Sequence, residues 1–471
     1  MTMRWMKVML GLGVVVLMPM VMLGQSTPKG SVRVYPSPVG EPLSKRFTVS
    51  VEGKDAPVYV AHVCSLLSEK PDVYQQGEAG FASFDIDGTV RVTVTATEKV
   101  KTVKILPSSY GIVAKIVGDA VTFTVSKPGQ ITVEVNGDWN NSLHVFANAF
   151  EDAPNLKDPN LIYFGPGRHE IESMHVGSGK TVYIAGGAVI YGKLTSGHVH
   201  EPVFSLVGEN ITLRGRGIID GSLHVKATAQ ANMIYAKGEA IEIEGVTLRD
   251  SSSWNVPIRQ STNVKVRNIK VFGWQLNSDG VDVVNSQNVD VSDSFLRSFD
   301  DLIVVKTSLK GGGISKDVTA ERLVLWNEKA HALTVGAELR EDAVDTVFSD
   351  CDIIHDKGHD WLLRVFNGDS GTVRHLVYDN IRIEEDRRPF SLFIGKTNWS
   401  KDEERGHIED VVFRNIQSPV PEWNHPTQLV GVDAAHEVKG VLFDHVTFGG
   451  KPMKAGDVEK NEFVEDVVVK P

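Results

Sequence analysis

The sequence is poor in cysteine and lacks long helical patterns. Only two of its 471 residues are cysteines, Cys64 and Cys351, so neither a disulfide-rich scaffold nor a Cys-based zinc site is expected. A disulfide between them and two buried free thiols both remain open. No convincing helical stretch separates the apolar segments, which argues against an alternating β–α fold. The G-x-S-x-G motif of serine hydrolases is also missing.

An excess of positive charge is missing as well. The chain has 49 Lys and Arg against 60 Asp and Glu, a formal net charge of −11. Phosphate backbones require a basic surface, so no nucleic-acid partner is expected. The same sign argues mildly against a polyanionic substrate. Hydrophobic residues make up 41% of the chain, which is enough for a large buried core.

Residues 1–24 have the pattern of a secretory signal peptide. Arg4 and Lys7 precede an apolar run from Val8 to Leu23. This run is short for a membrane span of roughly 20 residues, and Pro19 interrupts it. A membrane anchor is the alternative. We therefore expect an exported protein, periplasmic or extracellular, without stable membrane insertion.

Residues 25–137 are rich in short alternating segments such as TVRVTVTATE and GQITVEVNG. Many short strands separated by Gly, Pro, Asp or Lys predict a β-sandwich. It carries no cluster of His, Asp or Cys, so we interpret it as a structural module, with carbohydrate binding as the alternative. Residues 138–160 are polar and contain proline, and we interpret them as a linker.

Residues 161–471 contain a repeat with a period of about 23 to 30 residues, the range typical of solenoids. Each unit is a strand, a polar bend and a second strand, and Asn or Asp often opens it. The units include NITLRGRGIID, AIEIEGVTLRD, NVKVRNIKVFG, NVDVSDSFLRS, DVTAERLVLWN, TVRHLVYDNIRI and EVKGVLFDHVTF. Stacked units of this kind predict a right-handed parallel β-helix. The fold class is therefore all-β. A second sandwich or a propeller is the alternative.

Three carboxylates stand out between residues 277 and 306. Asp279 and the pair Asp300 and Asp301 are about one coil apart, and equivalent positions on successive coils lie about 4.8 Å apart. They can therefore meet on one face, provided that a bend lets both members of the pair point the same way. Repulsion between carboxylates keeps one protonated, and an inverting glycosidase needs one acid and one base. Solvated loop aspartates are the alternative.

These segments resemble glycoside hydrolase family 28, the polygalacturonases, and are similar to the family 49 dextranases and isopullulanases. NSDGVDVV and SFDD resemble the NTDG and GDD segments of family 28. GRGIIDG, SSSWNVPIRQ, AHALTVGAE and LLRVFNGDSG match further family segments in the same order. The likeness spans roughly residues 160 to 420. A β-sandwich ahead of the helix looks more like family 49.

The resemblance implies roles for individual residues. Asp300 matches the general acid, and Asp279 and Asp301 match the pair that activates water. His331 matches the histidine that supports the acid and the sugars on either side of the cleaved bond. Arg364 matches the arginine of an RIK segment.

The sequence departs from the family pattern at three positions. The lysine of RIK, which helps hold the carboxylate of galacturonan, is replaced by Phe366. Loss of a charge-assisted bond, together with the acidic net charge, favours a neutral sugar. Phe299 and Ala330 stand where the family has glycines, so two side chains are expected next to the carboxylates where the family has none.

Other residues are candidate substrate contacts: Asn277, Trp254 and Lys396. His355 and His359 have i, i+4 spacing, but the context is a loop, so no metal site is expected. No cofactor is expected either. We expect a monomer whose partner is a poly- or oligosaccharide.

The sequence thus predicts a secreted, inverting glycoside hydrolase that acts on a neutral glycan, in the manner of dextranases and isopullulanases. One alternative is a polygalacturonase-like pectin hydrolase. A polysaccharide lyase and a non-catalytic carbohydrate-binding β-helix are the others.

Overall fold

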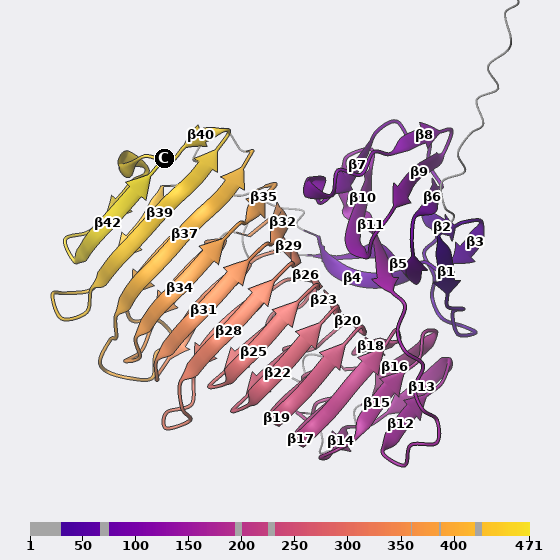
Figure 1. Ribbon diagram of the computed structural model, residues 1–471, viewed down its shortest axis with the longest axis horizontal. Helices are drawn as coiled ribbons and strands as arrows, with labels where there is room; N and C mark the ends of the chain where they lie inside the picture. The colour runs from indigo at the N-terminus through magenta and orange to yellow at the C-terminus, as the bar shows by residue number, and fades with distance from the viewer. Residues whose placement is uncertain are drawn as a thin grey trace, which may run out of the picture.

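The computed structural model describes residues 30–65, 75–193, 200–224, 231–358, 360–385, 388–419 and 426–471. The predicted signal peptide, residues 1–24, lies outside these ranges. The described chain forms two sheets near the N-terminus and one assembly of 31 strands (Figure 1). Its helices are two short 3-10 turns, η1 (Ser108–Tyr110) and η2 (Ala455–Asp457). Neither is long and apolar enough to cross a membrane.

The predicted N-terminal β-sandwich is confirmed. One sheet contains β1 (Ser31–Val34), β4 (Tyr59–Ser65), β5 (Gln75–Asp87), β7 (Val103–Leu106), β10 (Gly129–Val135) and β11 (Asp138–Ala149). The other contains β2 (Phe47–Val51), β3 (Lys54–Ala56), β6 (Val90–Ala96), β8 (Lys115–Val117) and β9 (Ala120–Val125). The sequence of β6, VRVTVTA, alternates between buried and more exposed residues. Its inward valines pack with Phe47, Phe84 and Phe123 between the sheets.

The connecting segment is shorter than the predicted linker of residues 138–160. Strand β11 occupies residues 138–149 and pairs with both β10 and β5. Its sequence lacks clear alternation because both of its faces are covered: Leu143 and Val145 point into the sandwich core, while His144 and Phe146 are fully buried on the other side. The connection to the second domain therefore begins after Ala149.

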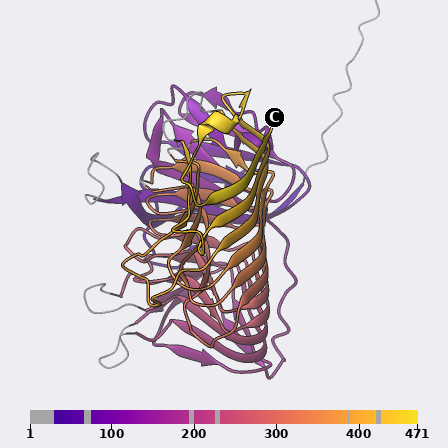
Figure 2. The same ribbon diagram turned by 90° about the vertical axis from the view of Figure 1, so that its left-hand side faces the viewer.

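The second domain is the predicted parallel β-helix. From β19 (Ile234–Glu244) onward, a strand generally pairs in parallel with the strand three positions later, so each coil contributes one strand to each of three walls. Figures 1 and 2 show these strands stacked in chain order, from magenta to yellow. Wall A contains β22 (Thr262–Arg267), β25 (Gln287–Ser292), β28 (Ser315–Glu321), β31 (Ala343–Ser349), β34 (Val373–Asp379), β37 (Ile408–Ser418), β39 (Val438–Phe448) and β42 (Val464–Lys470). Wall B contains β20 (Thr247–Arg249), β23 (Lys270–Phe272), β26 (Phe295–Ser298), β29 (Val324–Asn327), β32 (Asp352–Asp356) and β35 (Arg382–Ile383).

Wall C carries the site described below. It contains β21 (Val256–Arg259), β24 (Val281–Val284), β27 (Ile303–Thr307), β30 (Leu333–Leu339), β33 (Leu363–Asn367), β36 (Phe390–Ile394) and β38 (Thr427–Val430). The first coils are formed by β12 (Leu161–Phe164), β13 (Gly167–Ile171), β14 (Met174–Val176), β15 (Thr181–Ile184), β16 (Ala188–Gly192), β17 (Phe204–Gly215) and β18 (Ile218–Asp220). β40 (Lys451–Pro452) and β41 (Val458–Lys460) belong to the last coil region. Inward Val, Ile and Leu side chains from all three walls form one continuous core.

The Asn and Asp residues that open the repeats have a structural cause. Asn263, Asn288, Asp317, Asp345 and His375 occupy equivalent places at successive coils of wall A, and their φ angles lie between 52° and 60°. This left-handed conformation is unfavourable for most L-residues, but Asn and Asp tolerate it best. The repeat signal therefore marks a local backbone kink in each coil.

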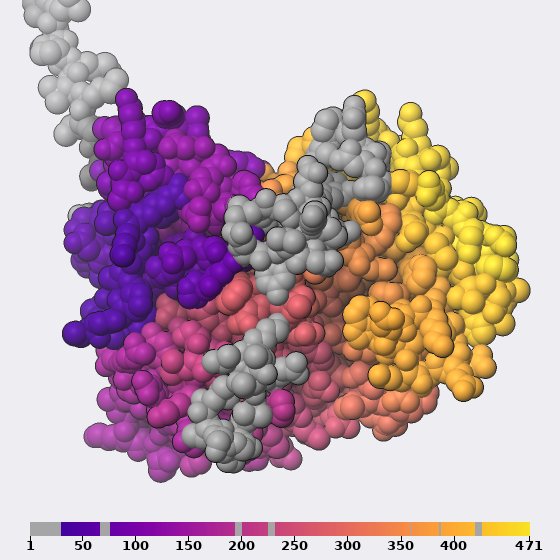
Figure 3. Space-filling view, turned by 180° about the vertical axis from the view of Figure 1, so that it is seen from behind, coloured from indigo at the N-terminus to yellow at the C-terminus, as the bar shows by residue number. Residues whose placement is uncertain are grey.

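Wall B packs against the N-terminal domain. Phe272 and Phe295 are fully buried, with their ring centroids 5.5 Å apart. Phe272 also stacks on Phe81 of β5 at 5.3 Å, and Trp326 of β29 is buried in the same cluster. Seen from behind, the indigo and purple N-terminal domain rests on the helix and leaves the last, yellow coils uncovered (Figure 3). The interface is therefore a second hydrophobic core, which joins the two domains.

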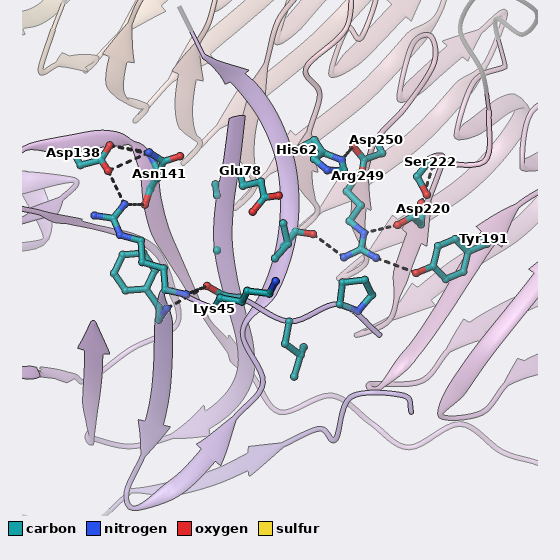
Figure 4. A pocket seen from close by; sticks show the side chains of 18 residues that line it. Lys45, His62, Glu78, Asp138, Asn141, Tyr191, Asp220, Ser222, Arg249 and Asp250 are labelled. Atoms are coloured by element: carbon teal, nitrogen blue, oxygen red, sulfur yellow. Dashed lines mark hydrogen bonds and ion pairs between the residues drawn. The ribbon is translucent and has the colours of Figure 1, made fainter. Parts of the chain in front are cut away.

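Paired charges surround a cavity of about 660 Å³ at this interface (Figure 4). Arg249 of wall B contacts Asp220 and Glu41, with both nitrogen–oxygen distances 2.5 Å. His62 of β4 lies 2.7 Å from Asp250. Buried ion pairs need good geometry and partners to be tolerated. The contacts of Arg249 with Glu41 and of His62 with Asp250 therefore help to fix the N-terminal domain on the helix.

Candidate active site

The three aspartates lie in the turns that lead from wall B to wall C. Val281, Ile303 and Leu333 are in register on consecutive coils, and Asp279, Asp301 and His331 each stand two residues before them. The backbone N–H of Gly280 donates to the carbonyl of Asp301 at 2.8 Å, and that of Leu302 donates to the carbonyl of His331 at 2.9 Å. The register of the helix therefore stacks Asp279, Asp301 and His331 above one another.

The side chains of these turns line a cleft of about 490 Å³. Eight of the nine predicted site residues line it: Trp254, Asn277, Asp279, Asp300, Asp301, His331, Arg364 and Phe366. Lys396 is exposed and is not among the lining residues. One carboxylate oxygen from each of the three aspartates lies within 4.8 Å of the other two. The structure therefore brings the predicted carboxylates together.

Asp300 and Asp301 reach the same cleft because the chain bends at residues 299–300. Phe299, which replaces the family's glycine, is buried, and Lys329 lies over its ring at 5.0 Å. Neither Phe299 nor Ala330 adopts a positive φ, so neither position requires glycine. The two departures from the family pattern are therefore compatible with the cleft.

A charged network favours the ionised form of Asp301. His331 Nδ1 lies 2.5 Å from Asp301 Oδ1, and its Nε2 lies 3.6 Å from Asp360 Oδ2. Burial of Asp301 raises its pKa, but the neighbouring His331 outweighs burial and leaves the pKa below its usual value. Burial conversely lowers the pKa of His331, but Asp301 and Asp360 outweigh it and raise the pKa to about 9. Arg364 completes the network through a 2.6 Å contact with Asp360.

Asp300 has the opposite tendency. Burial, followed by the negative charge of Asp301, raises its pKa above the usual value. The backbone N–H of Asn277 donates to Asp300 Oδ2 at 2.9 Å, which partly offsets that shift. Two adjacent carboxyl groups thus have pKa values pushed apart, which is the usual arrangement of an acid and a base in one site.

Two buried residues that the sequence interpretation missed, Asp282 and Lys306, lie behind Asp279. Lys306 Nζ is 3.2 Å from Asp279 Oδ2 and 3.0 Å from Asp282 Oδ1. Burial and then the charge of Asp282 raise the pKa of Asp279 well above its usual value, and Lys306 offsets this only in part. Burial also raises the pKa of Asp282, to about 6. The signal in the sequence was a charged residue within each of two strongly apolar strands, VDVV and LIVVK.

Aromatic rings form the cleft on both sides of the carboxylates. Lys306 Nζ lies 4.2 Å from the ring centroid of Trp254. On the C-terminal side, the Arg364 guanidinium lies 4.0 Å from the ring of Phe366, and Trp399 is 56% exposed. Trp254, Phe366 and Trp399 line the same cleft, and an exposed ring such as that of Trp399 can offer an apolar face to a sugar.

His355, one half of the i, i+4 histidine pair, has a structural role. Its Nε2 lies 2.5 Å from Glu134 of β10, and its Nδ1 lies 2.5 Å from Glu385. These contacts connect the N-terminal domain to the helix. His359 lies outside the described residues.

Comparisons with known proteins agree with this architecture. The model of the glycosyl hydrolases family 28 matches residues 167–462. An exopolygalacturonase from Arabidopsis thaliana is 25% identical over 186 residues, 38% of this chain and 41% of that protein. A polygalacturonase from Cryptomeria japonica is 20% identical over 235 residues, 44% of this chain and 43% of that protein. The chain thus spans about two fifths of the length of these curated relatives.

A solved structure, Dex49A from Penicillium minioluteum, shares the fold. It is 14% identical, with a TM-score of 0.59, over 93% of this chain and 96% of that one. The common fold therefore includes the N-terminal domain as well as the helix. The family match, covering most of the chain, shows that this protein belongs to glycosyl hydrolase family 28.

Proposed function

We propose that the protein hydrolyses glycosidic bonds of a poly- or oligosaccharide by direct displacement, with inversion at the anomeric carbon. The observation that carries the proposal is the group of three carboxylates in one cleft, with oxygens within 4.8 Å of one another and two adjacent pKa values moved in opposite directions. Family membership supports the reaction class.

The environments of Asp300 and Asp301, together with the resemblance of the segments to family 28, support the following roles. Asp300, whose pKa is raised, is the general acid that protonates the leaving oxygen. Asp301, kept ionised by His331, takes the proton of the attacking water. Asp279 stands one coil away and orients the same water. Arg364 and Asp360 hold the His331 ring in place.

The stereochemical outcome needs a direct test. The carboxyl groups of inverting enzymes are roughly 6.5–9.5 Å apart, and those of retaining enzymes about 5–5.5 Å. The closest oxygens of Asp279, Asp300 and Asp301 lie within 4.8 Å of one another. In the inverting mechanism proposed for this protein, Asp279 and Asp301 share the attacking water. Proton NMR of the first product identifies its anomer. Net inversion is expected, and net retention would overturn this part of the proposal.

A neutral glycan is the favoured substrate class. Phe366 takes the place of a cation, and the exposed Trp399 in the same cleft offers an aromatic face to a sugar ring. Two of the cations in the cleft, Lys306 and Arg364, are already held by aspartates. The second candidate is hydrolysis of galacturonan, which is favoured by the names of the curated relatives.

A reducing-sugar assay on dextran, pullulan, arabinan, rhamnogalacturonan and galacturonan separates the two candidates. Turnover of a neutral glycan is expected, and turnover of galacturonan alone would defeat the neutral-sugar proposal. An unsaturated product would indicate a lyase. Binding without turnover on this panel would indicate a carbohydrate-binding protein. The proposed export, suggested by residues 1–24, is tested by fractionating cells that produce the full chain.

A further inference from the structure

Lys306 lies at the base of the cleft, between two carboxylates. Its side chain is 6% exposed, and its amine contacts Asp279 at 3.2 Å and Asp282 at 3.0 Å. Asp282 belongs to β24 and Lys306 to the adjacent β27, where Val284 is the register partner of Lys306. The three side chains are therefore held together by the pairing of two coils, independently of any substrate.

Two carboxylates share one ammonium group in this buried place. Asp279 Oδ1 and Asp282 Oδ2 have no hydrogen-bond partner among the described residues. A buried carboxylate without full compensation favours its protonated form, while a neighbouring cation favours the ionised form. The ionisation of Asp279 therefore depends on whether the Lys306 ammonium group interacts mainly with Asp279 or mainly with Asp282.

We propose that Asp282 and Lys306 are positioning residues that set the ionisation of Asp279, Lys306 favouring the ionised form and Asp282 opposing it. This inference rests on the proposed function, in which Asp279 orients and helps to activate water. Neither Asp282 nor Lys306 needs to touch the reacting atoms for this role.

Other charged groups surround Asp279 and must stay constant in a test. Asp300 and Asp301 face it from the turn before β27 and add negative charge. The negative charge of Glu338 of β30 raises the pKa of Lys306, and His331 is hydrogen-bonded to Asp301. The variants below change none of these groups.

The test is the pH dependence of kcat/KM, whose acidic limb reports the carboxylates that must be ionised in the free enzyme. Lys306→Gln removes the cation beside Asp279, so the acidic limb is expected to move to higher pH. Asp282→Asn removes a negative charge and releases Lys306 to Asp279, so the limb is expected to move to lower pH. Each shift is expected to be about one pH unit or more. Lys306→Arg keeps the charge and should stay closer to the wild-type profile.

Opposite shifts distinguish this role from a purely structural one. Limbs that stay in place, or that move in the same direction in both variants, would overturn the inference. Circular dichroism and thermal unfolding establish that each variant is folded. If Lys306→Gln does not fold, the direction of the shift in Asp282→Asn decides alone.

Asp279→Asn separates this inference from the proposed function. Wild-type activity in that variant would defeat the assigned role of Asp279 and, with it, this inference, while the proposed hydrolysis would stand. Absence of turnover by the wild-type protein on every glycan of the panel would defeat the proposed function itself. If Asp279→Asn loses activity while the acidic limb of the kcat/KM profile stays in place in Lys306→Gln and Asp282→Asn, the inference is defeated and the proposed function stands.

Discussion

His331 Nδ1 lies 2.5 Å from Asp301 Oδ1, although 30 residues separate the two in the chain. They meet because each stands two residues before a strand of wall C, on consecutive coils. The contact keeps Asp301 ionised while its neighbour Asp300 has a raised pKa. The difference between the two adjacent aspartates is thus created by the next coil.

Replacing His331 with Gln should lower kcat/KM about tenfold or more, because burial then raises the pKa of Asp301 and only the more weakly acting Lys306 opposes it. Stability should change in a pH-dependent way. The pKa of His331 is raised from 6.5 to about 9, so its stabilising contribution is complete below pH 6.5 and is lost as the pH rises through about 9. The pKa of Asp301 is lowered, so its contribution to stability is lost only as the pH falls through that lowered value.

The denaturation midpoints of wild type and His331→Gln measure this effect. Their difference should be larger at pH 6 than at pH 10. His445→Gln, at an exposed position, is the matched control and should behave as wild type. An equal difference at both pH values would show that the histidine stays neutral.

Asp300→Asn should reduce kcat by roughly 10²–10⁴-fold while leaving the fold intact, because the amide cannot donate a proton to the leaving oxygen. Steady-state kinetics on the best glycan of the panel measure the loss. Asp119→Asn makes the same chemical change at an exposed turn of the N-terminal domain and should have no effect. Comparable activity in Asp300→Asn and wild type would remove Asp300 from the mechanism.

The aromatic side of the cleft should govern affinity for neutral sugars. Phe366→Ala and Trp399→Ala are each expected to raise KM about three- to tenfold, since an aromatic contact contributes roughly 0.5–1.5 kcal/mol. Phe366→Lys should shift the ratio of activities toward galacturonan. If that ratio is unchanged, Phe366 does not contribute to substrate choice.

The interface between the domains should be important for stability. Phe272→Ala removes a fully buried ring that contacts Phe81 and Phe295, and it should lower the free energy of unfolding by about 3–5 kcal/mol. Leu156→Ala, at a position that is 67% exposed, is the control and should stay within about 0.5 kcal/mol. Chemical denaturation followed by tryptophan fluorescence measures both.

Both cysteines should be protected thiols. Cys64 and Cys351 are free and buried, and burial raises the pKa of Cys351 to about 12. A thiol reagent at pH 8 should label neither in the native protein and both after unfolding. Detection of a disulfide by mass spectrometry of the unreduced protein would contradict the structure.

The periodicity of the sequence was sufficient to predict the β-sandwich and the β-helix. Alternation in segments such as VRVTVTA predicted strands, and the recurring Asn and Asp predicted coils because few other residues tolerate the left-handed position in wall A. β11 was missed because both of its faces are buried, one in the sandwich and one against the helix. A strand covered on both sides has no alternation to reveal it.

The cleft was predicted less completely than the fold. Asp279, Asp300 and Asp301 could be found because polar turn residues were spaced by one coil. The contacts of Asp282 and Lys306 depend on the register between β24 and β27, which spacing alone does not provide. Lys396 was placed in the cleft by its neighbourhood in the chain, but it is exposed and does not line the cleft.

Packing of the N-terminal domain on wall B has a consequence for design. The strands of wall C and the turns before them carry the carboxylates, whereas the domain is attached to the adjacent wall through Phe272, Phe295 and Trp326. Reshaping the aromatic side of the cleft, at Phe366 and Trp399, leaves that attachment untouched. The substrate specificity and the stability of this protein can therefore be changed by separate sets of substitutions.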